Sequence, residues 1–450
     1  MTVTDPDLRP RTPAPPPVEA ATERFDRRRL RERFRQVRQA TEAMAAPLAD
    51  EDQVVQSMPD VSPTKWHRAH TTWFFETFVL AHQPGYSSPD PRYDYLFNSY
   101  YEQVGPRHPR HERGLLSRPT VAEVGRYRRH VDDAFSSFAA GCSDLTWSEV
   151  AAIIEVGLHH EQQHQELALM DIKHVLSCNP LQPAYRPDTA PASAAADPGP
   201  AGWVEVTVSG DIGQVGADTV DGYSFDNEGP RHRALVPPFR IADRLVTCGE
   251  WRSFMADGGY RRPELWLSEG WATVQQAGWE APLYWSAPSD GDWELFTLHG
   301  PRAVEATEPV CHISFFEADA YARWAGARLP DEAEWEVAAG LHGAGEPPND
   351  MAADRLHPMP AGPGDPERPA LRQLHGDLWE WTGSPYRPYP GFAPAAGALG
   401  EYNGKFMCNQ MVLRGGACVT PAGHTRPTYR NFFPPHTRWA FGGLRLAHDA

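Results

Sequence analysis

Two histidines four residues apart, His160 and His164, have the spacing that most clearly predicts chemistry in this chain. They lie in residues 147–175, which contain no proline and repeat apolar residues at helical spacing. Residues i and i+4 of a helix share a face, so the two imidazoles can bind one metal ion. Residues 160–164 also match the HExxH pattern of zinc proteases, in which Glu161 would be the general base.

A third histidine, His70, lies in a second predicted helix that begins at Ser62 and Pro63, the pair typical of an N-cap and a first helical residue. Trp66 and Trp73 flank His70 at helical spacing, so we expect it deep in an apolar face. A lone buried histidine is more often a core residue than a ligand. Together with the other two, however, it would give three nitrogen ligands with open positions, which is typical of a reactive metal site.

The first 180 residues contain four amphipathic segments, which predict a four-helix bundle. The predicted helices cover residues 24–48, 62–82, 120–140 and 147–175. Pro-rich and Pro/Ala-rich stretches before and after them indicate a tail and a linker. We therefore predict a disordered tail, a helical bundle, a linker and a second domain at residues 1–22, 23–180, 181–202 and 203–450.

The second domain is rich in Gly, Pro and Trp and has little regular periodicity. Two strands and two helices are predicted at residues 203–208, 234–239, 314–325 and 331–339. Buried aromatic side chains must hold such a loop-rich domain together. The whole chain is therefore predicted to be an α+β multidomain protein.

Charge and composition exclude several classes of partner. The net charge of −17 argues against nucleic acid or an anionic membrane as a main partner. No apolar run approaches the roughly 18 residues of a membrane span, and the N-terminus lacks a signal-peptide core. The six cysteines are scattered without a CxxC pair, which indicates a reducing compartment. We expect a cytoplasmic protein.

Six motifs occur in order in the second half, at residues 221–232, 238–241, 328–336, 376–382, 412–416 and 441–445. Through them this half resembles the formylglycine-generating-enzyme and sulfatase-modifying-factor family, which implies a C-type-lectin-like fold. That family uses a catalytic cysteine pair. Here Cys418 follows Gly415 and Gly416, but no second cysteine comes after it. The thiol chemistry of the family is therefore not expected.

The first half, with its three histidines, resembles the DinB-like bundles that bind metal. In this order the two halves are similar to the EgtB family, the iron-dependent sulfoxide synthases of ergothioneine biosynthesis. The resemblance implies that His70, His160 and His164 bind Fe(II). It also implies an activity, in which O2 is used to join a cysteine sulfur to C2 of the hercynine imidazole and to oxidise that sulfur.

The resemblance further implies an active-site tyrosine that donates a proton. One branch of the family carries it in the C-terminal domain, where this chain has Leu399. Another branch carries paired tyrosines in an Asn-Ser-Tyr-Tyr segment, which here contains Tyr100 and Tyr101. We therefore predict these two as the catalytic residues, with Tyr101 favoured; their alternative role is ordinary aromatic packing.

Substrate contacts also follow from the resemblance. The residues that the resemblance implies as hercynine contacts are Gln163, Tyr402, Asn431 and Phe432. Phe433 and Thr437 replace the charged pair that holds a γ-glutamyl group, so L-cysteine is the predicted sulfur donor and γ-glutamylcysteine the alternative. The arginines available for the donor's carboxylate are Arg107, Arg110, Arg426 and Arg430.

Three other functions stay open at this point. A zinc protease is disfavoured because the third histidine lies 90 residues before the HExxH pattern. A selenoneine or ovothiol-type synthase could use the same two domains. A binding protein without activity would be favoured by the loss of one histidine, but all three are present.

Overall fold

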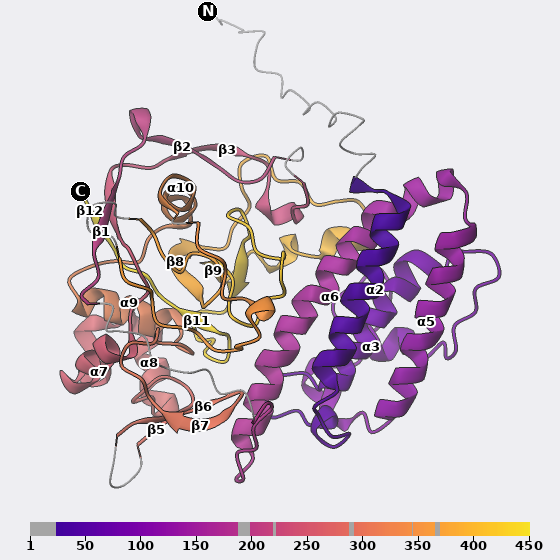
Figure 1. The fold of residues 1–450 in the computed structure, drawn as a ribbon, viewed down its shortest axis with the longest axis horizontal. Coiled ribbons are helices and arrows are strands. Elements are labelled where there is room, and N and C mark those ends of the chain that lie inside the picture. Colours follow the sequence, from indigo (N-terminus) through magenta and orange to yellow (C-terminus); the bar gives the residue numbers. More distant parts are fainter. Residues whose placement is uncertain (1–23, 188–198, 219–221, 288–291, 344, 365–369) are drawn as a thin grey trace, which may run out of the picture.

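The computed structural model describes residues 24–187, 199–218, 222–287, 292–343, 345–364 and 370–450. A helical bundle and a loop-rich domain lie side by side, and the 35-residue helix α6 runs along their boundary (Figure 1). The predicted tail and residues 188–198 of the predicted linker lie outside the described residues. The α+β class of the chain is confirmed.

The bundle contains the four predicted helices. They are α2 (Arg27–Ala45), α3 (Thr64–Phe75), α5 (Val121–Gly141) and α6 (Asp144–Cys178). A π-helical turn (Glu76–Leu80) follows α3, and the short helix α4 (Tyr93–Phe97) follows that turn. A capping box of Thr120 and Glu123 begins α5, and the Ser143 side chain caps α6.

The start of α3 differs from the prediction. Pro63 is the N-cap and Thr64 the first helical residue, so Ser62 caps nothing. Instead, the Ser62 backbone N–H donates to the Asp171 carboxylate on α6, at 2.8 Å. A buried carboxylate from another helix therefore accepts a hydrogen bond at the N-terminus of α3, and the local sequence does not indicate this long-range contact.

The second domain is built from short elements. Its strands are β1 (Trp203–Val206), β2 (Ile212–Val215), β3 (His232–Leu235), β4 (Phe239–Ala242), β5 (Trp285–Ser286), β6 (Glu294–Thr297), β7 (Gly300–Ala303), β8 (Trp379–Pro385), β9 (Met411–Arg414), β10 (Asn431–Phe433), β11 (Gly442–Gly443) and β12 (Ala447–Asp449). Its helices are α7 (Cys248–Ala256), α8 (Ser268–Ala277), α9 (Phe315–Trp324) and α10 (Glu332–His342). The largest sheet among the described residues has the order β10-β9-β8-β11.

Aromatic side chains form the core of this domain, as predicted. Four of its tryptophans are less than 2% exposed: Trp251, Trp335, Trp379 and Trp381. The predicted strand at residues 234–239 is wrong, because β3 ends at Leu235 and β4 begins at Phe239. Pro237 and Pro238 separate them, since proline cannot donate to a β-ladder. Helices α7 and α8 were not predicted.

Helix α6 packs into both domains through buried polar contacts. Its Glu166 accepts hydrogen bonds from Trp379 Nε1 at 2.6 Å and from Thr420 Oγ1. Burial raises the pKa of Glu166 to about 7. Nine residues after His164 on the same helix, Lys173 Nζ lies 2.7 Å from His312 Nε2. These contacts fix the second domain against one face of α6.

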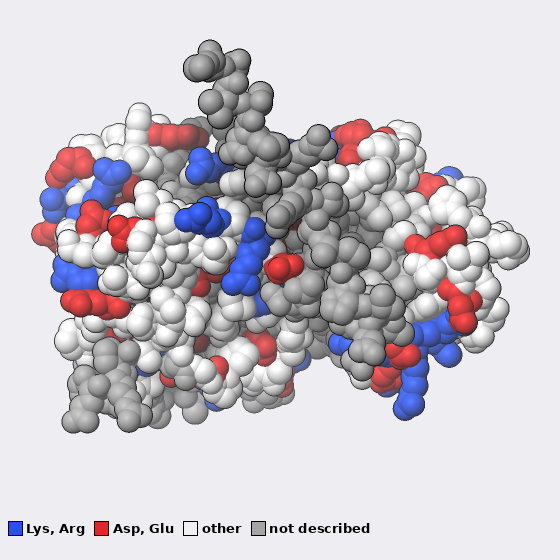
Figure 2. Space-filling model, turned by 90° about the horizontal axis from the view of Figure 1, so that it is seen from above, with Lys and Arg blue, Asp and Glu red and all other residues white. Residues whose placement is uncertain are grey.

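The surface carries charged side chains of both signs. In the view of Figure 2, acidic and basic side chains are interspersed. No described helix combines the length and the apolar character that crossing a bilayer requires.

A glycine in α6 permits its close contact with α3. A Cβ on Gly157 would lie 2.7 Å from Phe75 and 2.9 Å from Phe74, whose rings are fully buried. We expect Gly157→Ala to destabilise the protein by about 1–2 kcal/mol, because overpacking outweighs the gain in helix propensity. Thermal unfolding checks this. Gly141→Ala is the control, since its Cβ meets no atom within 4 Å. Equal stability of the two variants would contradict the prediction.

Candidate metal centre

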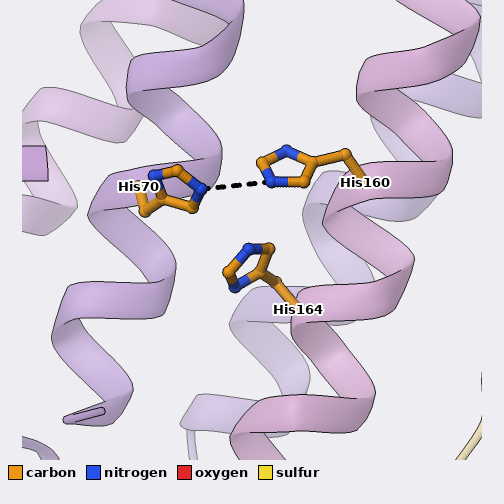
Figure 3. A group of neighbouring side chains, drawn as sticks. All are labelled: His70, His160 and His164. Atoms are coloured by element: carbon orange, nitrogen blue, oxygen red, sulfur yellow. Dashed lines mark hydrogen bonds between the residues drawn. The ribbon is translucent and has the colours of Figure 1, made fainter. Parts of the chain in front are cut away.

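Three buried histidines converge in the bundle core. His70 comes from α3, and His160 and His164 come from α6, one turn apart (Figure 3). Their ligand atoms all lie within 4.8 Å of one another, and the Nε2 atoms of His70 and His160 are 3.1 Å apart. Among the described residues, this is the one group of three or more His, Cys, Asp or Glu side chains close enough to hold a metal ion.

Burial keeps these imidazoles neutral. It is the main cause that lowers the pKa of His160 to about 3. Burial likewise lowers the pKa of His70 and of His164 well below the usual value, with the neighbouring histidines as a further cause. A metal binds the neutral imidazole, so no proton has to be displaced at ordinary pH.

The surroundings of His70 fix its orientation. Its ring stacks on Trp66 and on Trp73, with centroid distances of 4.7 and 5.5 Å. Its Nδ1–H donates to the Phe97 carbonyl at 2.6 Å, which leaves the Nε2 lone pair facing the other two histidines. His160 Nδ1, by contrast, is buried and has no hydrogen-bond partner among the described residues. Three neutral nitrogen donors, with no carboxylate among them, fit a borderline metal such as Fe(II) and leave coordination positions for other ligands.

Glu161 does not have the surroundings of a catalytic base. It is fully buried on the face of α6 away from the histidines, where Arg38 and Arg128 contact it at 3.0 and 2.9 Å. Thr41 Oγ1 donates to the same carboxylate at 2.6 Å. Although burial favours the neutral acid, the two arginines lower the pKa of Glu161 to about 2. Glu161 is therefore a buried structural anion; neither the protease role nor solvent exposure fits it.

Of the two predicted catalytic tyrosines, Tyr101 contacts helix α3 and Tyr100 contacts the second domain. Tyr101 is fully buried and packs on Trp73, the residue that stacks on His70, with a centroid distance of 5.6 Å. Tyr100 stacks on Tyr101 at 4.6 Å and is half-buried. Burial raises the pKa of Tyr101 well above its usual value, so its hydroxyl keeps its proton.

The loop that carries these tyrosines is held by the second domain. The Glu401 carboxylate accepts from the backbone N–H groups of Glu102 and Gln103, both at 3.0 Å. Lys405 bonds both Glu401 and the carbonyl of Tyr100. The segment that follows Leu399 therefore holds the loop that carries Tyr100 and Tyr101.

Gln163 lies between two tyrosines of the second domain. Its Nε2 donates to Tyr429 Oη at 2.6 Å, and Tyr402 Oη donates to its Oε1. The ring of Tyr402 lies 5.7 Å from that of His160 and stacks on Phe225 at 5.4 Å. Gln163 and Tyr402 are predicted from the sequence, but Tyr429 is not, because no spacing links it to the bundle.

The other predicted substrate residues lie on or beside β10. Phe432 stacks on Tyr386 at 4.0 Å and reaches Tyr100 only through Phe406. Asn431 Oδ1 accepts from the backbone N–H of Phe432. Phe433 is half-buried and contacts Trp439.

The arginines proposed from sequence are engaged elsewhere. Arg107 is exposed and pairs with Glu102, while Arg110 is exposed and bonds the Asp60 carbonyl. Arg426 pairs with Glu228, and Arg430 pairs with Glu332. In none of the four is the guanidinium both buried and without an acidic partner.

A fifth arginine, Arg113, has both properties. It is 4% exposed, and no carboxylate of the described residues lies within ion-pair distance. Its guanidinium carbon lies 3.3 Å from the ring centre of Trp66, and Nη1 donates to Ser62 Oγ at 2.9 Å. Its Nε is buried and has no hydrogen-bond partner in the described part of the chain, and burial lowers the pKa of Arg113 well below the usual value. A buried, unpaired cation beside the histidines favours an anionic ligand.

Cys418 is not part of the histidine group. It is a fully buried free thiol in the second domain, and burial raises its pKa well above the usual value. A buried thiol of this kind is unreactive.

Two different protein families match the two halves of the chain. The sulfatase-modifying factor enzyme 1-like domain matches residues 200–450, and the DinB superfamily matches residues 33–168. A hercynine oxygenase of Mycolicibacterium thermoresistibile is 35% identical over 422 residues, which cover 87% of this chain and 88% of that protein. The hercynine oxygenase of Mycolicibacterium smegmatis is 39% identical over 65% of this chain and 70% of its own length. A formylglycine-generating enzyme of Streptomyces coelicolor is 30% identical over 57% of this chain and 95% of that protein.

Removing the Glu161 charge should destabilise the bundle. Glu161→Gln leaves Arg38 and Arg128 buried with less opposite charge beside them, so we expect the free energy of unfolding to fall by about 3 kcal/mol. Glu149→Gln, at an exposed position of the same helix, should change it by less than about 0.5 kcal/mol. Urea titration measures both. If the two variants unfold alike, the buried network does not support the bundle.

Proposed function

This chain belongs to the hercynine oxygenase family, and from that premise we propose that it joins the sulfur of L-cysteine to the hercynine imidazole with an Fe(II) ion and O2. The imidazole C2–H and the thiol S–H are lost, and a C–S bond and an S–O bond form. The other oxygen atom of O2 leaves as water, so the four electrons that O2 accepts match the two two-electron oxidations. The buried group of three neutral histidines carries this proposal.

His70, His160 and His164 would hold the iron. When bound, Fe(II) would keep the substrate thiol deprotonated and activate O2. The protein contributes a preformed set of neutral donors in the bundle core. It also leaves coordination positions for several ligands, because no fourth His, Cys, Asp or Glu joins the group among the described residues.

Gln163 and its two tyrosine partners would receive hercynine. The amide that Tyr402 and Tyr429 hold in place lies on α6 immediately before His164. It offers a donor and an acceptor to an imidazole ring. The aromatic rings of Tyr402, Tyr429 and Phe225 lie together, and such a wall suits a quaternary ammonium group by cation–π attraction.

Arg113 would hold the carboxylate of the sulfur donor. It is buried, lacks an acidic partner, and contacts the tryptophan that stacks on His70. An amino-acid carboxylate would compensate this charge. The additional γ-glutamyl carboxylate and amine would meet no charge at Phe433 or Thr437, which is the reason to favour free L-cysteine.

The donor preference tests the function directly. With Fe(II)-loaded enzyme, hercynine and O2, we expect kcat/KM for L-cysteine to exceed that for γ-glutamylcysteine by at least about tenfold, equivalent to about 1.4 kcal/mol. O2 uptake and mass spectrometry of the sulfoxide measure it. Preference for the dipeptide would refute the donor, and absence of any sulfoxide would refute the function.

Arg113→Met gives an internal check of the binding site. Loss of a charge-assisted hydrogen bond should raise KM for cysteine by roughly 10–100-fold, while KM for hercynine stays near its original value. Arg126→Met is the matched control, because Arg126 is exposed on α5. An unchanged KM for cysteine would exclude Arg113 as its partner.

The buried tyrosine is the proposed proton donor near the reacting sulfur. We expect Tyr101→Phe to slow sulfoxide formation by about 100-fold and to divert cysteine towards its sulfinate, because no proton is delivered. Tyr100→Phe should have the smaller effect, and Tyr95→Phe, at an exposed position, should have none. Mass spectrometry of the sulfoxide and the sulfinate gives the product ratio of each variant. If Tyr101→Phe keeps the original rate and products, the assignment fails.

A further inference from the structure

We propose that a chain of hydrogen bonds from Asp171 through His67 to His164 sets which nitrogen of His164 faces the metal position. The inference rests on the metal site of the proposed function. It assigns a positioning role to two residues that bind neither metal nor substrate.

The chain is short, buried and continuous. His67 Nδ1 lies 2.8 Å from His164 Nδ1, and His67 Nε2 lies 3.0 Å from Asp171 Oδ2. The same Asp171 oxygen accepts the Ser62 backbone N–H at 2.8 Å. His67 and Asp171 are each 4% exposed, so water does not compete with these contacts.

The direction of each hydrogen bond follows from the groups at the ends. Asp171 Oδ2 is already an acceptor from Ser62, so it accepts again from the Nε2–H of His67. A neutral His67 with its proton on Nε2 has a bare Nδ1. In this neutral form the 2.8 Å contact requires His164 to be the donor, which places the His164 proton on Nδ1. The Nε2 lone pair of His164 is then free.

The free nitrogen is the one the site needs. Figure 3 shows the His164 ring with one nitrogen directed towards His70 and His160 and the other on the far edge of the ring. If the proton lay on Nε2 instead, it would occupy the space where the three lone pairs meet. The Asp171–His67 chain therefore selects the tautomer that can bind.

The three ligands differ in how they are held. His70 is set by a backbone carbonyl, that of Phe97, which substitution of the Phe side chain would not remove. His160 Nδ1 has no hydrogen-bond partner within the residues that the structure describes. Of the three Nδ1 atoms, only that of His164 contacts another described side chain, so its hydrogen bond is the one that a side-chain substitution can remove.

A purely structural role for Asp171 is the competing explanation. Its carboxylate lies at the N-terminus of α3, where an anion is stabilised by the helix dipole and by free N–H groups. On that explanation, His67 would only fill space. The two explanations differ in what a change at His67 does to metal binding.

The experiment compares two side chains of the same shape at position 67. His67→Leu removes the acceptor, and we expect it to weaken Co(II) binding by about 10–100-fold. His67→Asn places a carbonyl oxygen near the former Nδ1 position, so it should restore affinity to within about threefold. Affinity is measured by chelator competition, monitored by the visible Co(II) spectrum. His130→Gln, an exposed histidine on α5, is the control.

A second readout does not require metal. In metal-free protein labelled with 15N-histidine, NMR should show His164 protonated on Nδ1 in the original chain and in His67→Asn. In His67→Leu it should show a mixture of tautomers. Thermal unfolding of each variant separates loss of metal binding from loss of folding. If His67→Leu does not fold, Asp171→Asn replaces it. We expect Asp171→Asn to bind Co(II) at least about fivefold more weakly than the original chain.

The outcomes distinguish this inference from the proposed function. Equal Co(II) affinity of the folded His67→Leu (or Asp171→Asn) variant and the original chain would overturn the positioning role and leave the metal site intact. Failure of the original chain to bind Co(II) would overturn the metal site itself.

Discussion

The burial of three imidazoles in one bundle core is the constraint on which the rest of this structure depends. Desolvation lowers the pKa of His70, His160 and His164, so all three remain neutral and available as ligands. Neutral rings in an apolar core still need directed hydrogen bonds to fix their tautomers. The stacked tryptophans and the contacts of His70 Nδ1 and His164 Nδ1 therefore belong to the site as much as the histidines do.

The same helix presents two opposite kinds of chemistry. One face of α6 holds neutral imidazoles, while Glu161, adjacent to His160 in sequence, is a buried anion between two arginines. The arginine network satisfies its own charges, so it does not require a charge from the metal site. Helical geometry separates adjacent residues by about 100°, which allows a ligand and a structural anion to be neighbours in the chain.

The second domain matches an enzyme family, but no second cysteine follows Cys418 in its sequence. Its contribution is made through Tyr402, Tyr429, Glu401 and Lys405, which fix Gln163 and the tyrosine loop of the bundle. A loop-rich domain suits this task, because many loop positions can contact a partner surface while a buried aromatic core keeps them rigid.

The sequence by itself determined the four helices of the bundle, the three histidines and the aromatic second domain. These are local or periodic features, since helical spacing places His160 beside His164 and a hydrophobic stripe buries His70. Only the tertiary structure decided the partners of Ser62, the buried unpaired state of Arg113 and the chain from Asp171 to His164. Each of these depends on side chains that meet across helices or domains, where a hydrogen bond or a missing countercharge is set by distance in space and not by spacing in the chain.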